Sequence, residues 1–392
     1  MAWVIGSVFY AYQYVLRVMP SIMMHDILEQ FDINAATFGQ FSGVYYIGYA
    51  FMHLPLGILL HKYGPKKVMP LCILLSVVGI TPIIFSTNWI YAVIGRVLLG
   101  IGSSAAILGL FHIIHFSFEE KQFSSMLSYS VVIGLIGAIY GGAPVNLMCN
   151  ELGYKNVVIV FSLIGVLLAL LAYFLIPAVA ESTKNASIMS DLLEVLSNSK
   201  VVFFCLLAGL MVGPLEGFAD IWGPTYLQQV YHFDKTSATG LPSLMYIGMG
   251  FGAPLLSNIA ERTNSHLKVI ITSAIIMLIS FITFTTIKLP IYAVFPVMFI
   301  VGMCSSYQIL AIYKATTYVK NHIVGLTTTF ANMMIMLFGY FFHSIIGYTV
   351  NVLGGENDSF ALSMGIMIIP LSLGIAAIGF IFIGRLGKGK KL

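Results

Sequence analysis

The stretch GIGSSAAIL at positions 100–108 recurs as GMCSSYQIL at positions 302–310, and this repeat decides how the chain is organised. A second stretch, FDINAAT at 31–37, recurs as FDKTSAT at 233–239, at the same offset of 202 residues. A third match, Tyr46-Ile47-Gly48 against Tyr246-Ile247-Gly248, has an offset of 200. Matches that keep their register across half the protein indicate two copies of one structural unit.

The chain as a whole has the composition of an integral membrane protein. Of its 392 residues, 59% are hydrophobic and 9% are charged, and the mean hydropathy is +0.94, whereas soluble domains carry about 25% charged residues. The first apolar run lacks the basic start and the cleavage site of a signal peptide, so we expect it to stay as a membrane span. The scattered cysteines fit no metal or redox motif, and the dispersed basic residues argue against nucleic acid.

Apolar windows of about 20 residues, the length that crosses the hydrocarbon core of a bilayer, predict twelve helices. These runs show no period-two alternation, which excludes β-barrel strands. The predicted fold class is an all-α integral membrane protein with twelve transmembrane helices in two pseudo-symmetric bundles of six. The expected limits are 2–28, 36–60, 67–86, 89–116, 122–146, 156–177, 201–228, 240–260, 267–287, 290–316, 322–350 and 359–384.

Six helices followed by six in the same orientation form a parallel repeat, whose axis lies along the membrane normal. We expect an N-terminal bundle at 1–177, a cytoplasmic linker at 178–200 and a C-terminal bundle at 201–392. The aliphatic run at 192–196 of the linker predicts a short amphipathic helix on the membrane surface. With the N-terminus in the cytoplasm, the cytoplasmic loops and tail hold fourteen of the 19 Lys and Arg and the other side holds three, so both termini are predicted to be cytoplasmic.

Three motifs resemble those of the major facilitator superfamily, and the resemblance covers essentially the whole chain. The connection between the second and third predicted helices, GILLHKYGPKK at 57–67, resembles the family's loop signature of G-x-L-a-D-r-x-G-r-k type. The stretch RVLLGIG at 96–102 resembles its fourth-helix signature, R-x-x-x-G-x-G, and GYK at 153–155 resembles the start of its sixth helix. The resemblance implies a fold in which helices 1, 4, 7 and 10 line a central cavity.

The resemblance also implies a latch that closes the cytoplasmic side. His61 stands where the family carries an acidic residue, which departs from that latch, while the counterpart loop in the second half keeps an acidic and a basic residue. The expected gating residues are Gly57, His61, Lys62, Gly64, Lys66, Glu261 and Arg262. The fifth helix lacks the glycine spacing of the family's antiporter signature, which favours uptake over drug export.

Four ionisable residues lie near the middle of predicted spans: Arg17 on the first helix, Arg96 on the fourth, and Glu216 and Asp220 on the seventh. All four lie on helices that the resemblance places around the cavity. A charge at the centre of a membrane helix costs about 2.5 to 3.5 kcal/mol on insertion scales, so such residues usually serve a function.

Arg17 is part of a polar stripe. Tyr10, Gln13, Tyr14 and Arg17 stand at i, i+3, i+4 and i+7, the spacing of one helix face. We interpret Arg17 as facing a wet cavity, where it contacts substrate or a gate; the alternative is a structural arginine bonded to backbone carbonyls. Arg17 lies fourteen residues before the repeated Phe-Asp pair at 31–32, and the seventh-helix acids lie thirteen and seventeen residues before the pair at 233–234. These similar spacings place Arg17 and the acids at a similar height in the membrane, so we expect a basic wall of the cavity opposite an acidic one.

Such a cavity suits a zwitterion or a small carboxylated solute. Arg17 and Arg96 would hold a carboxylate in paired hydrogen bonds, and Glu216 or Asp220 would receive an ammonium group or a proton. The two acids are four residues apart and repel each other where water is scarce, so we hypothesise proton coupling through them, with Arg96 in the same group. The alternative is that these charges pair directly, as a gate or a structural bridge.

Uncharged contacts are expected on the tenth helix from Ser306, Tyr307 and Gln308; the alternative for them is hydrogen bonding between helices. His112 and His115 have the spacing of a metal pair, but no third ligand is evident nearby, and we interpret them as a helix end at the cavity mouth. We predict no metal and no cofactor.

The sequence therefore predicts a secondary transporter rather than an enzyme. We expect a proton-coupled importer of a small polar solute, such as an amino acid, a short peptide or an organic acid, that works by alternating access. The alternatives are an exporter of metabolites or drugs, an uncoupled facilitator, and a membrane-embedded enzyme, for which no H-E-x-x-H or G-x-S-x-G motif is present. The expected partners are the solute, protons and the lipid bilayer but no nucleic acid, and we expect a monomer in a bacterial inner membrane.

Overall fold

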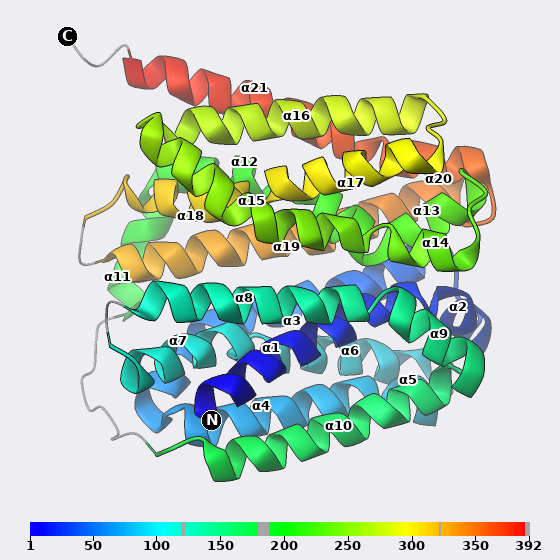
Figure 1. The fold of residues 1–392 in the computed structure, drawn as a ribbon, viewed down its shortest axis with the longest axis horizontal. Coiled ribbons are helices and arrows are strands. Elements are labelled where there is room, and N and C mark those ends of the chain that lie inside the picture. The colour runs from blue at the N-terminus through cyan, green and yellow to red at the C-terminus, as the bar shows by residue number, and fades with distance from the viewer. Residues whose placement is uncertain (120–121, 179–187, 321–322, 389–392) are drawn as a thin grey trace. The chain divides into compact units, whose positions relative to one another are not determined.

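The computed structural model of the chain describes residues 1–119, 122–178, 188–320 and 323–388. The described residues form helices and turns without strands (Figure 1), so the prediction of an all-α fold is confirmed. They divide into two compact units.

The first unit begins with a helix that ends in a 3₁₀ turn, η1 (Met19–Ser21). Its helices are α1 (Ala2–Val18), α2 (Met24–Phe31), α3 (Ala35–Tyr63), α4 (Pro65–Ile80), α5 (Pro82–Phe85), α6 (Trp89–Ser103), α7 (Ala105–Ser117), α8 (Phe123–Tyr140), α9 (Ala143–Leu152) and α10 (Tyr154–Leu175), and the short α14 (Lys235–Gly240) is grouped with them.

The second unit contains a π-helix, η3 (Gly213–Trp222), in the span that opens it. Its α-helices are α11 (Ile188–Ser197), α12 (Ser199–Gly209), α13 (Gly223–Gln229), α15 (Ser243–Arg262), α16 (His266–Thr286), α17 (Ile291–Ser305), α18 (Tyr307–Thr316), α19 (Val324–Leu353), α20 (Ser359–Ile366) and α21 (Ile368–Lys388).

Helices occupy all twelve predicted span positions within the described residues. Nine helical runs there are long and apolar enough to cross a membrane, and the pair Ser125–Tyr140 and Ala143–Leu152, bent by 41°, makes up to ten. The predicted spans 2–28 and 240–260 correspond to α1, of 17 residues, and α15, of 20 residues, which are not among the nine. The prediction of twelve crossings is consistent with these helices.

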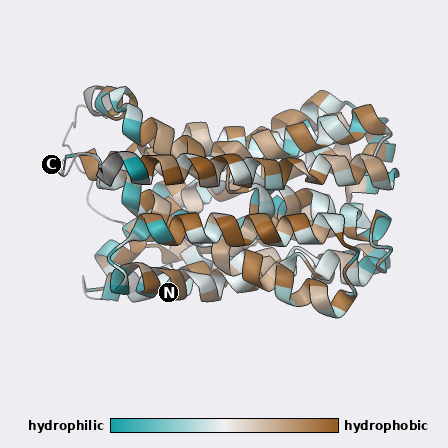
Figure 2. Ribbon diagram, turned by 90° about the horizontal axis from the view of Figure 1, so that it is seen from above, coloured by the Kyte–Doolittle hydropathy of each residue, from teal (hydrophilic) through white to brown (hydrophobic). Residues whose placement is uncertain are grey.

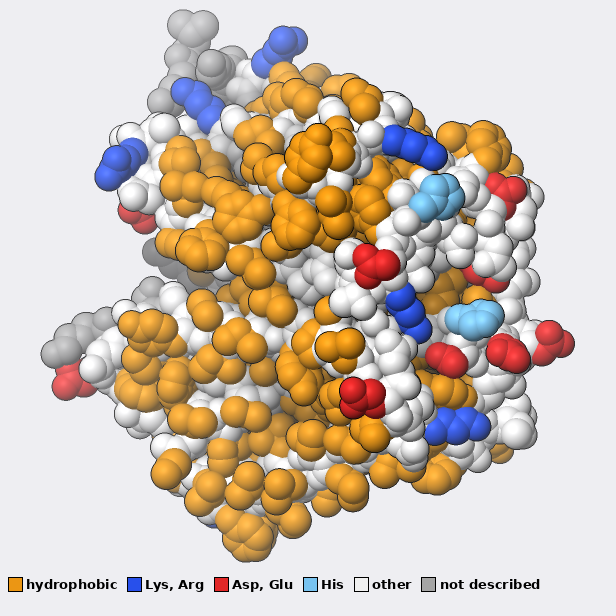
Figure 3. Space-filling model, turned by 45° about the vertical axis from the view of Figure 1, so that its right-hand side comes forward, with side chains coloured by type: hydrophobic (Ala, Val, Ile, Leu, Met, Phe, Trp, Pro, Cys, Tyr) orange, Lys and Arg blue, Asp and Glu red, His pale blue; other side chains and the backbone are white. Residues whose placement is uncertain are grey.

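Residues of high hydropathy are concentrated along the middle of the helices, and hydrophilic residues gather toward the helix ends (Figure 2). A space-filling view shows hydrophobic side chains over wide areas of one face, with charged side chains mostly toward its edges (Figure 3). Large apolar residues such as Phe51, Phe174 and Ile378 are strongly exposed. An exposed apolar belt of this extent is what contact with lipid requires.

The internal repeat is visible in how each unit packs. A methyl group added at Gly48 on α3 would collide with the backbone carbonyl of Val97 on α6, and one added at Gly248 on α15 would collide with that of Phe299 on α17. Val97 and Phe299 are themselves 202 residues apart. The same close crossing of two helix backbones, which only a glycine permits, therefore occurs in both units.

The helix breaks also repeat. In the first unit α6 gives way to α7 at Ser104, and in the second α17 gives way to α18 at Ser306, 202 residues later. Each break lies within the recurring nine-residue stretch, at 100–108 in the first unit and 302–310 in the second. The repeat thus extends from sequence to local backbone.

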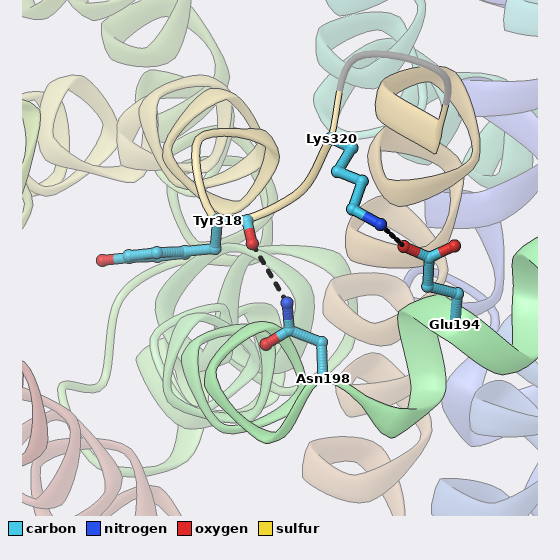
Figure 4. Close-up of polar contacts among 4 residues, drawn as sticks. All are labelled: Glu194, Asn198, Tyr318 and Lys320. Atoms are coloured by element: carbon cyan, nitrogen blue, oxygen red, sulfur yellow. Dashed lines mark hydrogen bonds and ion pairs between the residues drawn. The ribbon is translucent and has the colours of Figure 1, made fainter.

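A helix, α11, is present in the predicted linker, and its place on the membrane surface stays a prediction. Residues 179–187 of the predicted linker lie outside the described residues. Four lysines used for the orientation, Lys121, Lys184, Lys390 and Lys391, also lie outside them. The side chain of Asn198 follows α11, and its Nδ2 donates to the carbonyl of Tyr318, 3.0 Å away (Figure 4). Beside this bond, Lys320 Nζ lies 3.6 Å from a carboxylate oxygen of Glu194.

Candidate functional site

The polar stripe of α1 packs against tyrosines of α3. Gln13 is 3% exposed, and its Oε1 accepts a hydrogen bond of 2.8 Å from the hydroxyl of Tyr45. Arg17 is 4% exposed, and its guanidinium carbon lies 4.6 Å from the ring centroid of Tyr14 and 5.7 Å from that of Tyr46. The charge is therefore held among aromatic rings, whose electron-rich faces attract a cation.

Tyr10 completes this cluster at its half-buried side. Its ring centroid is 5.2 Å from that of Tyr14, in an edge-to-face arrangement. The structure thus brings together all four residues of the predicted stripe. It adds Tyr45 and Tyr46, which sequence reasoning did not assign to the site.

Arg96 of α6 contacts the backbone at the end of α1. Its Nη1 and Nη2 donate hydrogen bonds of 2.9 Å to the carbonyls of Leu16 and Arg17. In a regular helix the Leu16 carbonyl would accept from the amide of residue 20, but residue 20 is Pro20, which has no N–H. Arg96 therefore satisfies a carbonyl that the proline leaves without its helical donor, which is the type of contact that sequence analysis considered as the alternative for Arg17. The predicted role of Arg96 in substrate and proton binding stays a prediction.

The acidic pair lies in the π-helix η3. All ten residues of this helix are buried; Glu216 is 1% exposed and Asp220 is fully buried. The predicted shared face of the two acids assumes α-helical spacing, whereas a π-helix forms hydrogen bonds between residues i and i+5. The shared face therefore stays a prediction. π-Helical segments are rare and occur frequently at functional sites.

Two side chains from other helices of the second unit contact this segment. The hydroxyl of Tyr246 on α15 donates a hydrogen bond to Oδ1 of Asp220. His343 of α19 is fully buried, and its Nε2 lies 2.6 Å from the carbonyl oxygen of Glu216. Because a carbonyl only accepts, Nε2 carries the proton in this bond. The indole of Trp222 donates in turn to the carbonyl of His343, 3.4 Å away.

The tenth-helix residues divide into two groups. Ser306 donates to the carbonyl of Met249 at 2.8 Å and Tyr307 to the carbonyl of Ala208 at 2.6 Å, so both bind the backbone of other helices, as the alternative interpretation expected. Gln308 is 7% exposed, and its Nε2 has no hydrogen-bond partner within the described ranges. Of the three, Gln308 is the one that retains a donor for a ligand.

Six of the seven predicted gating residues lie at helix ends, while Gly57 lies inside α3. Gly64 joins α3 to α4 with φ of 75°, a left-handed conformation that favours glycine. Lys66 lies two residues after Gly64, and its Nζ is 5.9 Å from the ring centroid of Tyr173 on α10. His61 and Lys62 are exposed. A methyl group on Gly57 would meet nothing within 4 Å.

In the second unit Glu261 and Arg262 are exposed at the end of α15. Across the part of the chain that is described, no group of three or more His, Cys, Asp or Glu has the arrangement of a metal site.

A comparison with known families identifies the chain. The sequence profile described as Major Facilitator Superfamily matches residues 3–342. The chain belongs to the major facilitator superfamily. The resemblance drawn from the motifs is thereby confirmed, and the superfamily is one of membrane transporters.

Individual relatives are distant. The proton-coupled antiporter flippase LtaA of Staphylococcus haemolyticus is 26% identical over 244 residues, which cover 61% of this chain and 59% of the flippase. An uncharacterized protein of Campylobacter jejuni is 26% identical over 223 residues, covering 55% of this chain and 68% of that protein. The match thus spans less than two thirds of the flippase.

Solved structures share the fold. The nucleoside transporter NupG has a TM-score of 0.79 at 14% identity, covering 98% of this chain and 99% of its own. A bacterial homologue of the human lysosomal transporter Spinster has a TM-score of 0.77 at 14% identity, covering 98% and 96%. A peptide transporter of the POT family has a TM-score of 0.72 at 11% identity, covering 100% and 97%. The expected superfamily fold is confirmed.

Proposed function

We propose that this chain is a proton-coupled secondary transporter that imports a small carboxylated or zwitterionic solute by alternating access. The observation that carries the proposal is a pair of buried charged clusters of opposite sign, Arg17 in the first unit and Glu216 with Asp220 in the second. Each cluster lies on the span that opens its repeat. Ionisable residues buried in membrane spans are costly and mark substrate or proton pathways.

The roles divide by charge. Arg17, supported by Tyr10, Gln13 and Tyr14, holds a carboxylate of the solute. Glu216 and Asp220 receive an ammonium group or the coupling proton. Gln308 adds an amide donor, and the backbone contacts of Arg96 assign to it the support of α1 alongside its predicted part in proton coupling.

The proposal also covers gating, oligomeric state and orientation in the membrane. The residues at the α3–α4 junction and at the end of α15 act as gates at the cytoplasmic side. The protein works as a monomer in a bacterial inner membrane. Both termini lie in the cytoplasm in this proposal, which is supported by the excess of Lys and Arg in the loops and tail assigned to that side.

Uptake into sealed proteoliposomes tests the proposal. With L-alanine, L-alanyl-L-alanine and succinate as probes, we expect accumulation above the outside concentration when the interior is alkaline, and loss of that accumulation when an ionophore collapses the gradient. Arg17→Gln should abolish uptake, and Glu216→Gln should keep exchange but lose the response to the gradient. Lys320→Gln, at an exposed site, serves as the matched control.

A second candidate is proton-coupled antiport. It is favoured by the relative named as a proton-coupled antiporter flippase. In that case an outward-directed proton gradient, with the interior acidic, would drive uptake of the probe, or none of these probes would move and a lipid would. Uptake that ignores the pH gradient altogether would leave only an uncoupled facilitator.

A further inference from the structure

In each unit, an ionisable residue of the opening span contacts a tyrosine of the next long span. Arg17 lies with its guanidinium carbon 5.7 Å from the ring centroid of Tyr46, and Asp220 accepts a hydrogen bond from the hydroxyl of Tyr246. Arg17 and Asp220 are 203 residues apart and the tyrosines 200, each close to the 202-residue repeat. All four side chains are at least 96% buried.

The tyrosines stand on rigid parts of their helices. Each is followed two residues later by the crossing glycine, Gly48 or Gly248, whose backbone packs directly on that of another helix. A helix fixed at its crossing point holds the side chains beside it in a defined position. The repeat therefore places the same residue type at the same packing point in both units.

Tyrosine is suited to both partners because it offers two different binding elements. The face of its ring attracts a guanidinium, while its hydroxyl donates a hydrogen bond to a carboxylate. A tyrosine can thus be kept at one position of a duplicated unit while the charge that it supports changes sign.

We propose that Tyr46 and Tyr246 are positioning residues, each within its own unit, with Tyr46 orienting Arg17 through its ring and Tyr246 orienting Asp220 through its hydroxyl. The inference rests on the proposed function, since it assigns support to the two charged groups that bind solute and proton. It predicts that removal of the hydroxyl alone has unequal consequences in the two units. Phenylalanine keeps the ring face but has no donor.

The first test compares kinetics of uptake in proteoliposomes, using whichever of L-alanine, L-alanyl-L-alanine and succinate the wild type accumulates. Tyr246→Phe loses a hydrogen bond to a carboxylate, so its KM should rise about tenfold or more with little change in kcat. Tyr46→Phe should change KM by less than about threefold, whereas Tyr46→Leu, which removes the ring, should raise it about fivefold.

The control is Tyr12→Phe, which removes a buried tyrosine hydroxyl that donates to the carbonyl of Phe161 at 2.8 Å and contacts neither charged cluster. It should leave KM unchanged. Equal effects of Tyr46→Phe and Tyr246→Phe, or a Tyr246→Phe variant that behaves like Tyr12→Phe, would overturn the proposal.

A second test needs no transport. In a double-mutant cycle on thermal unfolding, Tyr246→Phe with Asp220→Ala should lower Tm by less than the two single changes together, because each change alone already removes the shared bond. Additive losses would refute the contact between Tyr246 and Asp220. If the cycle shows coupling but the wild type moves no probe, the proposed function fails while the positioning of Asp220 by Tyr246 stands.

Discussion

The opening spans of the two units carry their charges on differently built backbones. In the first unit α1 stops at a 3₁₀ turn with Pro20, and Arg96 donates to the carbonyls of Leu16 and Arg17. In the second unit the chain forms the π-helix η3, and His343 donates to the carbonyl of Glu216. Each irregular backbone is thus braced by a buried basic side chain from elsewhere in its own unit.

Arg96 and His343, the side chains that donate to these carbonyls, have no counterparts at the repeat offset, although the helix packing around them is repeated. The position 202 residues after Arg96 is Met298, and the one 202 residues before His343 is Gly141. By contrast, the crossing glycines and the serine breaks recur in register. The duplicated units therefore share how their helices cross, while each has its own way of satisfying the carbonyls near its charged residues. Inside a membrane those carbonyls need a donor from the protein itself.

The largest expected loss of stability comes from removing Arg96 or His343, and the two losses should differ in size. Arg96→Met leaves two buried carbonyls without their donor, and His343→Phe leaves one. At about 1–3 kcal/mol for each unsatisfied group, Arg96→Met should lower the free energy of unfolding by about 2–6 kcal/mol and His343→Phe by about half as much. Thermal unfolding of purified protein measures both, and Lys155→Met, at an exposed site, should change it by less than about 0.5 kcal/mol.

Pro20 provides a specific rescue for the first of these variants. In the Arg96→Met background, Pro20→Ala supplies the amide that the Leu16 carbonyl lacks, and about 1 kcal/mol of stability should return. The same change has no bearing on His343→Phe, in the other unit. If Pro20→Ala recovers nothing, the loss caused by Arg96→Met does not come from the Leu16 carbonyl.

Some of these features could be predicted from the sequence and others could not. Apolar windows and the repeat predicted the helix positions, because hydrophobic length and register are local properties of the chain. The stripe of Tyr10, Gln13, Tyr14 and Arg17 was likewise visible, since it needs only helical periodicity. The partners Tyr45, Tyr46 and Tyr246 were not, because they depend on how neighbouring helices are rotated against each other.

The contact of Arg96 and the π-helix η3 differ in whether the sequence contains a feature that predicts them. Pro20 removes a specific amide and thereby indicates that the Leu16 carbonyl needs another donor, so the contact of Arg96 could have been anticipated in kind. The π-helix of the second unit had no comparable signal, because Pro214 and the glycines near it are compatible with several helix types. His343, to which we assigned no role from the sequence, became informative only through its contact with Glu216.

The next largest loss of stability is expected at the glycine crossings, which both units share. Gly48→Ala and Gly248→Ala each place a methyl group against a backbone carbonyl that has no room to move, and each should destabilise its unit by about 1–3 kcal/mol. Gly374→Ala, where a methyl group meets nothing within 4 Å, should instead stabilise α21 by up to about 1 kcal/mol. Thermal unfolding of the three variants decides; a clear difference between Gly48→Ala and Gly248→Ala would mean that the two crossings are no longer equivalent.

The smallest effect concerns the linker helix α11, which belongs to the second unit and has no counterpart in the repeat. Asn198 caps α12, because its Oδ1 accepts from the amides of Lys200 and Val201 at 3.2 and 3.4 Å, and its Nδ2 reaches the carbonyl of Tyr318. Asn198→Ala should therefore destabilise the second unit by about 1 kcal/mol or somewhat more.

Asn198→Asp and Lys320→Gln show which contact holds α11 to the rest of its unit. Asn198→Asp keeps the cap and loses only the bond to Tyr318, so its loss should be smaller than that of Asn198→Ala. The pair of Lys320 and Glu194, whose side chains are 77% and 42% exposed, is screened by water, and Lys320→Gln should change stability by less than about 0.5 kcal/mol. If Lys320→Gln costs more than Asn198→Ala, charge rather than the asparagine bonds attaches the linker helix, and raised salt should then weaken that attachment as well.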